Sequence, residues 1–251
     1  MSKKDYNEWY KFSLLDHFWM KSRFSAFLKI VNKNKIKFNS RQNILDIGCG
    51  TGVLAQQLYN KYRIKCDLYD QSSSAFKEYI KSKIPHNNFY NGKLSTLNFK
   101  KKYHKIFLFD VIEHLPKKDL QIFFKKISKI ICDDGVIIIN VPGLQFLYSS
   151  YDVELHHKKR YNKKDLIKLA LKFKYNIKCV EYWGFFFIPL LVFRKIYLLF
   201  NKKKIVERSF KIENKILNYF LYFLYKIETI FNSVLVGTSI LCILEQRKNI
   251  K

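Results

Sequence analysis

Short apolar runs alternate with longer amphipathic stretches through the middle of the chain. Apolar residues recur at helical spacing between positions 119 and 131, which predicts a helix over Asp119–Ile131, and a similar stretch predicts another over Asn162–Phe173. Strands are predicted at Asn43–Ile47, Ile64–Tyr69, Asn88–Asn91, His104–Phe109, Val136–Val141, Ile177–Trp183 and Thr238–Glu245. This alternation favours an α/β fold with a doubly wound, mostly parallel seven-stranded sheet.

Two segments depart from this alternation, one at the start of the chain and one before the last strand. The chain is accordingly divided into an N-terminal helical cap (1–40), an α/β core (41–183), an apolar helical insertion (184–236) and a last strand with the C-terminal tail (237–251). Within the insertion, Gly184–Phe193 is continuously apolar and Ile216–Tyr225 nearly so, but each run is shorter than the ~20 residues that span a bilayer. We expect two helices with a broad apolar face, rimmed by Lys202, Lys203, Lys204, Lys211 and Lys215.

The charge of the chain is strongly positive, with 47 lysine and arginine residues against 20 acidic ones and a formal net charge of +27. Such a charge attracts polyanions, either an anionic membrane surface or nucleic acid. The alternative is a general enrichment in lysine that covers every solvated face. Lysine far outnumbers arginine, and nucleic-acid readers favour arginine for bidentate contacts, so nucleic acid is the less favoured partner.

The N-terminus and the cysteines favour a cytoplasmic protein, with peripheral contact to the inner face of the membrane as a further hypothesis. The first eleven residues are polar and lack the apolar stretch of a signal peptide. The five cysteines lie in or beside predicted strands and predict reduced thiols: Cys49, Cys66, Cys132, Cys179 and Cys242. Their spacing contains no paired metal ligands, so no metal site is expected from it.

A glycine-dense turn follows the first predicted strand and is the most informative segment of the chain. Gly48, Gly50 and Gly52 lack a Cβ, which permits positive φ and close approach of a ligand to the backbone. On its own the pattern is also compatible with a simple tight turn. Asp46, placed directly before the turn, argues for a ligand with an amino group, because a pyrophosphate cradle would avoid a carboxylate there.

The segment Ile44–Gly52, with the sequence ILDIGCGTG, resembles motif I of the class I S-adenosylmethionine (SAM) dependent methyltransferases. Other segments match in order: Asp70 resembles the acidic residue that ends the second strand, and Phe109–Leu115 resembles the fourth motif in its small-molecule form. Gly135–Pro142 resembles the fifth strand. The resemblance implies a Rossmann-like methyltransferase fold with SAM as the cofactor.

The resemblance also implies which residues bind SAM. Asp46 would accept from the ammonium of the amino-acid tail, and Asp70 would accept from the ribose hydroxyls. The other implied cofactor contacts are Gly48, Cys49, Gly50, Gly52, Gln71, Leu94, Ser95 and Asp110. The chain departs from the pattern at Gly92-Lys93, where relatives often have Gly-Asp. The departure predicts loss of the usual carboxylate contact to adenine, which Leu94 or Ser95 would replace through backbone groups.

A second group of polar residues follows the fifth predicted strand, in the loop from Asp152 to Tyr161. It resembles a segment of methyltransferases associated with cell-surface polysaccharide and lipid pathways, which implies acceptor contacts from Asp152, Arg160 and Tyr161. Neutral imidazole suits removal of a hydroxyl proton near pH 7, so His157 is the predicted catalytic base. The alternative is a basic lid loop in which His157 is structural and Arg160 holds a carboxylate or phosphate.

Four further positions complete the predicted acceptor side. Asp110 and His114 are the next candidates for a catalytic role, although His114 equally fits a loop residue packed under the cofactor. Trp19 and Arg23 belong to an N-terminal segment that resembles one in some relatives and implies substrate contacts.

These observations predict SAM-dependent methyl transfer to a small molecule or a glycan or lipid intermediate, on oxygen. A scaffold that binds SAM without chemistry is the alternative outside enzymes. A nucleic-acid methyltransferase is the other alternative, but Asp110-Val111-Ile112-Glu113 is not the Asn/Asp-Pro-Pro-Tyr segment that base-amino methyltransferases of this fold usually carry.

Overall fold

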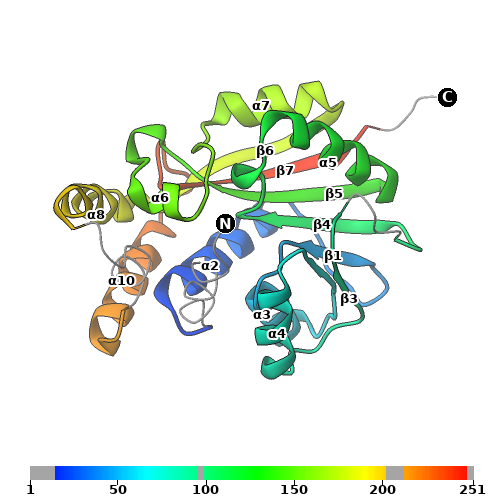
Figure 1. Cartoon of the computed structure of the whole chain (residues 1–251), viewed down its shortest axis with the longest axis horizontal. Helices are drawn as coiled ribbons and strands as arrows, with labels where there is room; N and C mark the ends of the chain where they lie inside the picture. The colour runs from blue at the N-terminus through cyan, green and yellow to red at the C-terminus, as the bar shows by residue number, and fades with distance from the viewer. Residues whose placement is uncertain (1–14, 95–98, 202–211, 248–251) are drawn as a thin grey trace.

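The computed structural model describes residues 15–94, 99–201 and 212–247, which fold around one seven-stranded sheet (Figure 1). The strand order is β3-β2-β1-β4-β5-β7-β6. The strands are β1 Ile44–Ile47, β2 Asp67–Asp70, β3 Phe89–Asn91, β4 Tyr103–Phe109, β5 Ile131–Pro142, β6 Tyr175–Trp183 and β7 Ser239–Gln246. The first five are mutually parallel, whereas β7 runs antiparallel to both β5 and β6. The predicted mostly parallel sheet is therefore confirmed.

The fifth strand begins earlier than its sequence pattern indicates. Tyr103 pairs with Ile131, whereas Lys105 pairs with Val136, so residues of β5 bulge out between the two pairs. Gly135 lies in this bulge, where a Cβ would stand 2.8 Å from the carbonyl oxygen of Cys132. Gly135 is thus an irregularity within β5, which begins at Ile131 and not at the predicted Val136.

Helices cover both faces of the sheet because its central strands are apolar on both sides. Along β4, Phe107 and Phe109 enter the core cluster on one face, and Ile106 and Leu108 enter the cluster on the other. The first face is covered by α2 (Phe18–Lys33) and α3 (Val53–Tyr62), the second by α5 (Lys117–Ile130) and α7 (Lys163–Lys172). α4 (Ser73–Ser82) follows β2. The helices predicted at 119–131 and 162–173 correspond to α5 and α7.

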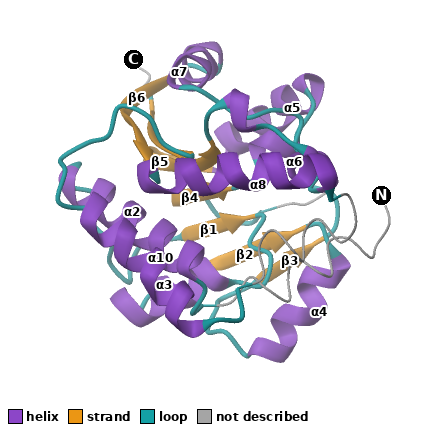
Figure 2. Cartoon of the chain, turned by 90° about the vertical axis from the view of Figure 1, so that its left-hand side faces the viewer, coloured by secondary structure: helices purple, strands orange, loops and turns teal. Residues whose placement is uncertain are grey.

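The long connection between β6 and β7 forms two helices, α8 (Ile188–Phe200) and α10 (Lys215–Glu228). α10 packs beside α2 (Figure 2). There Asn218 accepts a hydrogen bond from the backbone N–H of Phe18 (2.7 Å). α8 packs on the short helix α6 (Ser150–Glu154). Three 3-10 turns, η1 (Ile112–His114), η2 (Gln145–Leu147) and η3 (Phe185–Phe187), complete the described elements.

The insertion contacts the N-terminal helix and the loop after β5, so these predicted units pack together around one end of the sheet. Of the predicted lysine rim, Lys215 is exposed, whereas Lys202, Lys203, Lys204 and Lys211 lie outside the described residues. Within the described part of the chain, every helix is too short or too polar to cross a membrane.

Candidate active site

A cavity of about 1020 Å³ opens at the carboxyl ends of the parallel strands. The segments that follow β1, β2 and β4 form one side of it, and α2, α8 and α10 contribute the other. This is the edge at which parallel α/β sheets place their ligands. Of the residues predicted for the site, thirteen line the cavity: Trp19, Arg23, Asp46, Gly48, Cys49, Gly50, Asp70, Gln71, Leu94, Asp110, His114, His157 and Arg160.

The glycine turn after β1 exposes backbone to the cavity. Gly48 has φ 74°, and a Cβ there would lie 2.6 Å from Cγ2 of Val111. Gly50 has φ 54° and donates its N–H to Asp70 (2.9 Å). Gly52 caps the N-terminus of α3 and does not line the cavity. Cys49 does line it, and burial raises the pKa of its thiol.

Asp46 places an unpaired carboxylate oxygen at the floor of the cavity. The residue is 2% exposed, and its Oδ2 has no hydrogen-bond partner among the described residues. Burial raises the pKa of Asp46 to about 7, with Arg23 opposing the shift and Asp70 adding to it. A buried carboxylate without a partner is costly, so this position favours a cationic group from a ligand.

Asp70 ends β2 and is held by two backbone donors. Its Oδ2 accepts from the N–H of Gly50 (2.9 Å) and its Oδ1 from that of Ser72 (2.8 Å). Burial raises the pKa of Asp70 while these two bonds lower it. Each oxygen has a further lone pair for a ligand hydroxyl. Gln71 and Leu94 line the same part of the cavity, and Ser95 lies outside the described residues.

Asp110, at the end of β4, is the centre of a polar network that crosses the sheet. Its Oδ2 accepts from Nη1 of Arg23 (2.6 Å), and its Oδ1 accepts from Nδ2 of Asn140 (2.8 Å). Asn140 is fully buried and also accepts from Nε1 of Trp183 (2.9 Å). Asp110 itself has φ 56°, a strained conformation that this network holds.

Arg23, which was predicted to contact the substrate, lines the cavity, and its guanidinium is ion-paired with Asp110. Its neighbour Trp19 packs against Trp183, with ring centroids 5.1 Å apart, and lines the cavity. Asn140 was not predicted from the sequence. The signal that could have found it is that Asn140 is the single polar residue in the apolar run Val136–Val141.

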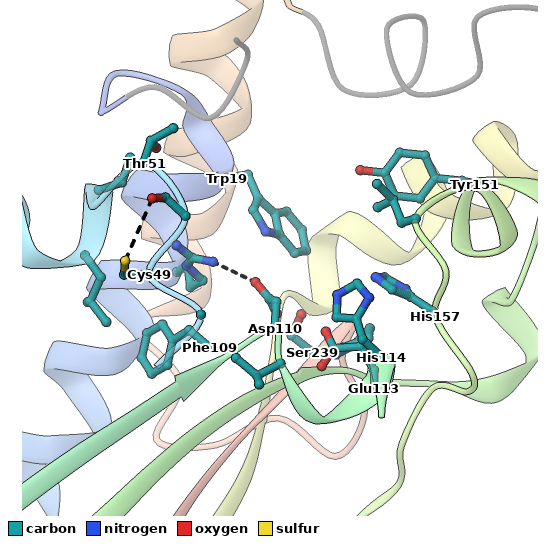
Figure 3. Close-up of a pocket in the computed structure, with 18 of the residues that line it drawn as sticks. Trp19, Cys49, Thr51, Phe109, Asp110, Glu113, His114, Tyr151, His157 and Ser239 are labelled. Atoms are coloured by element: carbon teal, nitrogen blue, oxygen red, sulfur yellow. Dashed lines mark hydrogen bonds and ion pairs between the residues drawn. The ribbon is translucent and has the colours of Figure 1, made fainter. Parts of the chain in front are cut away.

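Glu113, His114 and His157 gather on the far side of Asp110 (Figure 3). Glu113 is fully buried, and burial together with Asp110 raises its pKa well above the usual range. Burial and the neighbouring His157 lower the pKa of His114 to about 3. The rings of His114 and His157 meet edge to face at 4.8 Å. Glu113 was noticed in the motif but received no predicted role.

Asp152 organises the loop that carries His157. Its Oδ1 lies 2.9 Å from Nδ1 of His157 and 2.9 Å from Nε of Arg160. Nη2 of Arg160 donates to Oδ2 of Asp152 (3.2 Å), and Nη1 donates to the carbonyl of Gly143 (3.2 Å). Burial raises the pKa of Asp152, but the bond from His157 and the charge of Arg160 outweigh it, and the net shift is downward.

Two residues predicted to touch the acceptor are placed elsewhere, because the loop uses them for its own support. Asp152 is fully buried beneath His157 and Arg160 and does not line the cavity. Tyr161 packs in the core, and its hydroxyl donates to the carbonyl of Ile112 (3.2 Å). Arg160 reaches the cavity, but three of its N–H groups are already engaged.

Arg194, which directly follows the apolar run Gly184–Phe193 and received no predicted role, lines the cavity. Its guanidinium stacks 3.9 Å from the ring centroid of Tyr151, and both residues line the cavity. Its Nε has no hydrogen-bond partner among the described residues, and burial lowers its pKa. This unpartnered N–H of a guanidinium that lines the cavity is suited to an anionic group of a ligand.

Comparisons with known proteins agree with this geometry. The methyltransferase domain family matches residues 19–186. The chain is 34% identical over 122 residues to (S)-coclaurine N-methyltransferase of Papaver somniferum, covering 45% of this chain and 34% of that protein. It is 32% identical over 123 residues to ribosomal RNA small subunit methyltransferase C of Buchnera aphidicola, covering 43% of this chain and 32% of that protein. The chain thus spans about a third of the length of these curated relatives.

Solved structures show a similar fold. Haemonchus contortus phosphoethanolamine N-methyltransferase 2 in complex with SAM has a TM-score of 0.55 at 18% identity, covering 86% of this chain and 52% of that one. Coclaurine N-methyltransferase bound to N-methylheliamine and S-adenosylhomocysteine (SAH) has a TM-score of 0.55 at 17% identity, covering 88% and 72%.

Proposed function

The chain belongs to the class I SAM-dependent methyltransferases, and we propose that its acceptor is a small molecule methylated on oxygen. Its cofactor is SAM, which supplies an electrophilic methyl group on a sulfonium when bound. The cavity fits this cofactor, because the unpaired oxygen of Asp46 suits an ammonium and Asp70 offers acceptors for ribose hydroxyls. Gly48 and Gly50 line the same cavity as these two carboxylates, so a ligand held there can approach their backbone closely.

The residues on the acceptor side of the cavity support methylation of an oxygen atom. A hydroxyl must lose its proton as it attacks the methyl group, whereas a neutral amine already presents a lone pair. His157 lines the cavity and is oriented through Nδ1 by a buried carboxylate, Asp152, at 2.9 Å. With Nδ1–H directed to Asp152, Nε2 is the free basic atom that takes the proton. Arg194 binds an anionic group of the acceptor beside it.

Methylation of nitrogen is the competing function, because two similar proteins are named N-methyltransferases. Methylation of nucleic acid and binding of SAM without chemistry are the remaining alternatives. A cavity enclosed by Phe18, Leu191 and Leu221, from the cap and the insertion, favours a small or slender acceptor over a folded RNA.

The test is transfer of label from methyl-labelled SAM into fractionated cell extract. We expect the label in a small molecule or lipid fraction, as a methyl ether. A methyl ether survives the acid and base treatments that hydrolyse methyl esters. Label on an amine, on RNA or in no fraction would overturn the proposal for a small oxygen acceptor.

An exposed apolar surface on the insertion favours contact with a membrane. We define this apolar face by the exposed side chains of Leu190, Phe193, Ile196, Tyr197, Leu199, Phe200, Ile216, Leu217, Tyr219, Phe220 and Phe223. Four of them also line the cavity, namely Leu190, Phe193, Tyr197 and Leu217. We propose that the apolar face rests on an anionic bilayer, since it is continuous with the cavity mouth and the chain carries a net charge of +27. A lipid-linked acceptor would then enter the cavity from the bilayer.

The double variant Phe200→Ser/Ile216→Ser is expected to weaken binding to vesicles that contain phosphatidylglycerol by at least about tenfold. These side chains are 82% and 81% exposed and do not line the cavity, so SAM binding should be unchanged. The measurement is co-sedimentation with vesicles at low salt. Ile122→Ser is the matched control, because Ile122 is 62% exposed on α5, away from the apolar face. Equal binding of the wild type and the double variant would contradict membrane contact through this face.

A further inference from the structure

Glu113 is a buried carboxylate that the proposed function does not use. It is fully buried, and neither of its oxygens has a hydrogen-bond partner among the described residues. Nδ1 of His114 is also buried without a partner. An unpaired buried charge is strongly unfavourable unless it is neutralised by a proton or meets a cation. A group of unpaired polar atoms at the cavity wall therefore needs an explanation beyond packing.

The unpaired atoms of Glu113 and His114 face a third potential ligand on His157. One ligand atom from each of Glu113, His114 and His157 lies within 4.8 Å of the other two. Figure 3 shows the three side chains pointing toward one another beside Asp110. A cation with bonds of about 2.1 Å draws adjacent ligands to roughly 3 Å, so small side-chain rotations bring these three into contact with one ion.

We propose that Glu113, His114 and His157 bind a divalent transition-metal cation, and that this cation holds the acceptor's hydroxyl oxygen in the cavity. Two imidazoles and one carboxylate form a ligand set used for such ions, and three protein ligands leave positions open for water and substrate. The inference rests on the proposed function and deepens it.

The surroundings of the three side chains have the features of a metal site. Asp152 accepts from Nδ1 of His157 at 2.9 Å, which leaves Nε2 of His157 as the ring nitrogen available to a cation. A carboxylate behind a ligating histidine is a common second contact in metal sites, where it fixes the tautomer and orientation of the ring. The charge of Arg160 acts on Glu113, but its guanidinium is engaged by Asp152 and forms no hydrogen bond with Glu113.

A bound cation changes how the acceptor loses its proton. It lowers the pKa of a coordinated hydroxyl, so the proton leaves to solvent when the acceptor binds, and the oxygen is held as the nucleophile. His157 then acts as a ligand of the cation and no longer as the direct proton acceptor. An amine would gain less, because it needs no deprotonation before it attacks. The cation thus selects acceptors that carry a hydroxyl group.

For the test, the purified full chain is first freed of metals with a chelator. It is then titrated with Mn²⁺, and electron paramagnetic resonance measures the bound ion. Mn²⁺ prefers oxygen and nitrogen ligands, so the cysteines compete weakly. We expect one bound Mn²⁺ per chain, and at least about tenfold weaker binding in Glu113→Gln. Circular dichroism and SAH calorimetry on the same variant show whether it is folded.

His104→Ala is the matched control. His104, Cys132 and Asp134 also bring potential ligand atoms within 4.8 Å, but Asp134 is exposed and Nδ1 of His104 already accepts from the N–H of Asn43 (3.1 Å). We expect wild-type Mn²⁺ binding in this variant. Binding that is lost in His104→Ala and kept in Glu113→Gln would overturn the proposed site.

SAH binding by the same samples separates this inference from the proposed function. If the wild type binds SAH but no Mn²⁺ up to about 1 mM, the cation site is wrong while the methyltransferase function stands. If the wild type binds no SAH, the proposed function fails whatever the result with Mn²⁺.

Discussion

Replacing His157 by alanine is expected to lower the rate of methyl transfer by about 10²–10⁴, the range typical for loss of a general base. His157 reaches the acceptor end of the cavity and is held by Asp152, so its loss removes either the proton acceptor or a ligand of the proposed cation. SAM affinity should be unchanged, because His157 belongs to the loop after β5, whereas the residues assigned to the cofactor lie in or after β1, β2, β3 and β4. The measurement is the single-turnover rate at saturating SAM.

His156→Asn is the control for this prediction. His156 is adjacent in sequence, does not line the cavity and has φ 60°, a conformation that asparagine tolerates. It should keep the wild-type rate. A full rate in His157→Ala across pH 6 to 9 would contradict both roles given to His157, and Asp110 would become the next candidate.

Much of the fold could be predicted because the core strands carry a clear local signal. β1 and β4 are short apolar runs bounded by polar residues, and both lie close to their predicted positions. β5 began earlier than predicted, since Asp133 and Asp134 break its apolar pattern and the structure absorbs them in a bulge. A bulge interrupts the two-residue alternation of a regular strand, so the sequence pattern does not indicate that the strand continues through it.

The parts of the site that escaped prediction depend on contacts between distant segments. The pairing of Arg23 with Asp110 joins positions 87 residues apart, and nothing local in either segment indicates it. Arg160 escaped prediction for another reason, since Asp152 lies in the same loop. Its residue type suggests an anion-binding group, but only the folded loop shows that Asp152 and the carbonyl of Gly143 already accept hydrogen bonds from its guanidinium. The segments that resemble the cofactor motifs do lie together along the cavity, because they follow neighbouring parallel strands whose carboxyl ends meet at one edge of the sheet.

For the insertion, composition predicted the helices but not which of their apolar residues are buried. Its two apolar runs predicted helices with a broad apolar face, and α8 and α10 occupy those runs. Leu191, Leu221 and Tyr225 are buried against the core, whereas Phe193 and Phe200 are 69% and 82% exposed. Composition could not divide the apolar residues between core and surface, because that division depends on where α2 and α6 pack.

Replacing Asp70 by alanine is the other change expected to have a large effect, and it acts on cofactor binding. The variant loses the acceptors for the ribose hydroxyls, and charge-assisted hydrogen bonds of this kind contribute roughly 1.5–3 kcal/mol each. It also frees the N–H groups of Gly50 and Ser72, which Asp70 holds at 2.9 and 2.8 Å. The affinity for SAM should fall by at least about tenfold, since 1.4 kcal/mol corresponds to that factor.

The most direct test of Asp70 as part of the SAM site is calorimetric titration with SAH. It compares the wild type, Asp70→Ala and the control Asp119→Ala. Asp119→Ala removes the same charge from an exposed position on α5. The account predicts one SAH bound per chain in the wild type and the control, with affinity at least about tenfold lower in Asp70→Ala. Equal affinity in all three proteins, or no binding by the wild type, would contradict it.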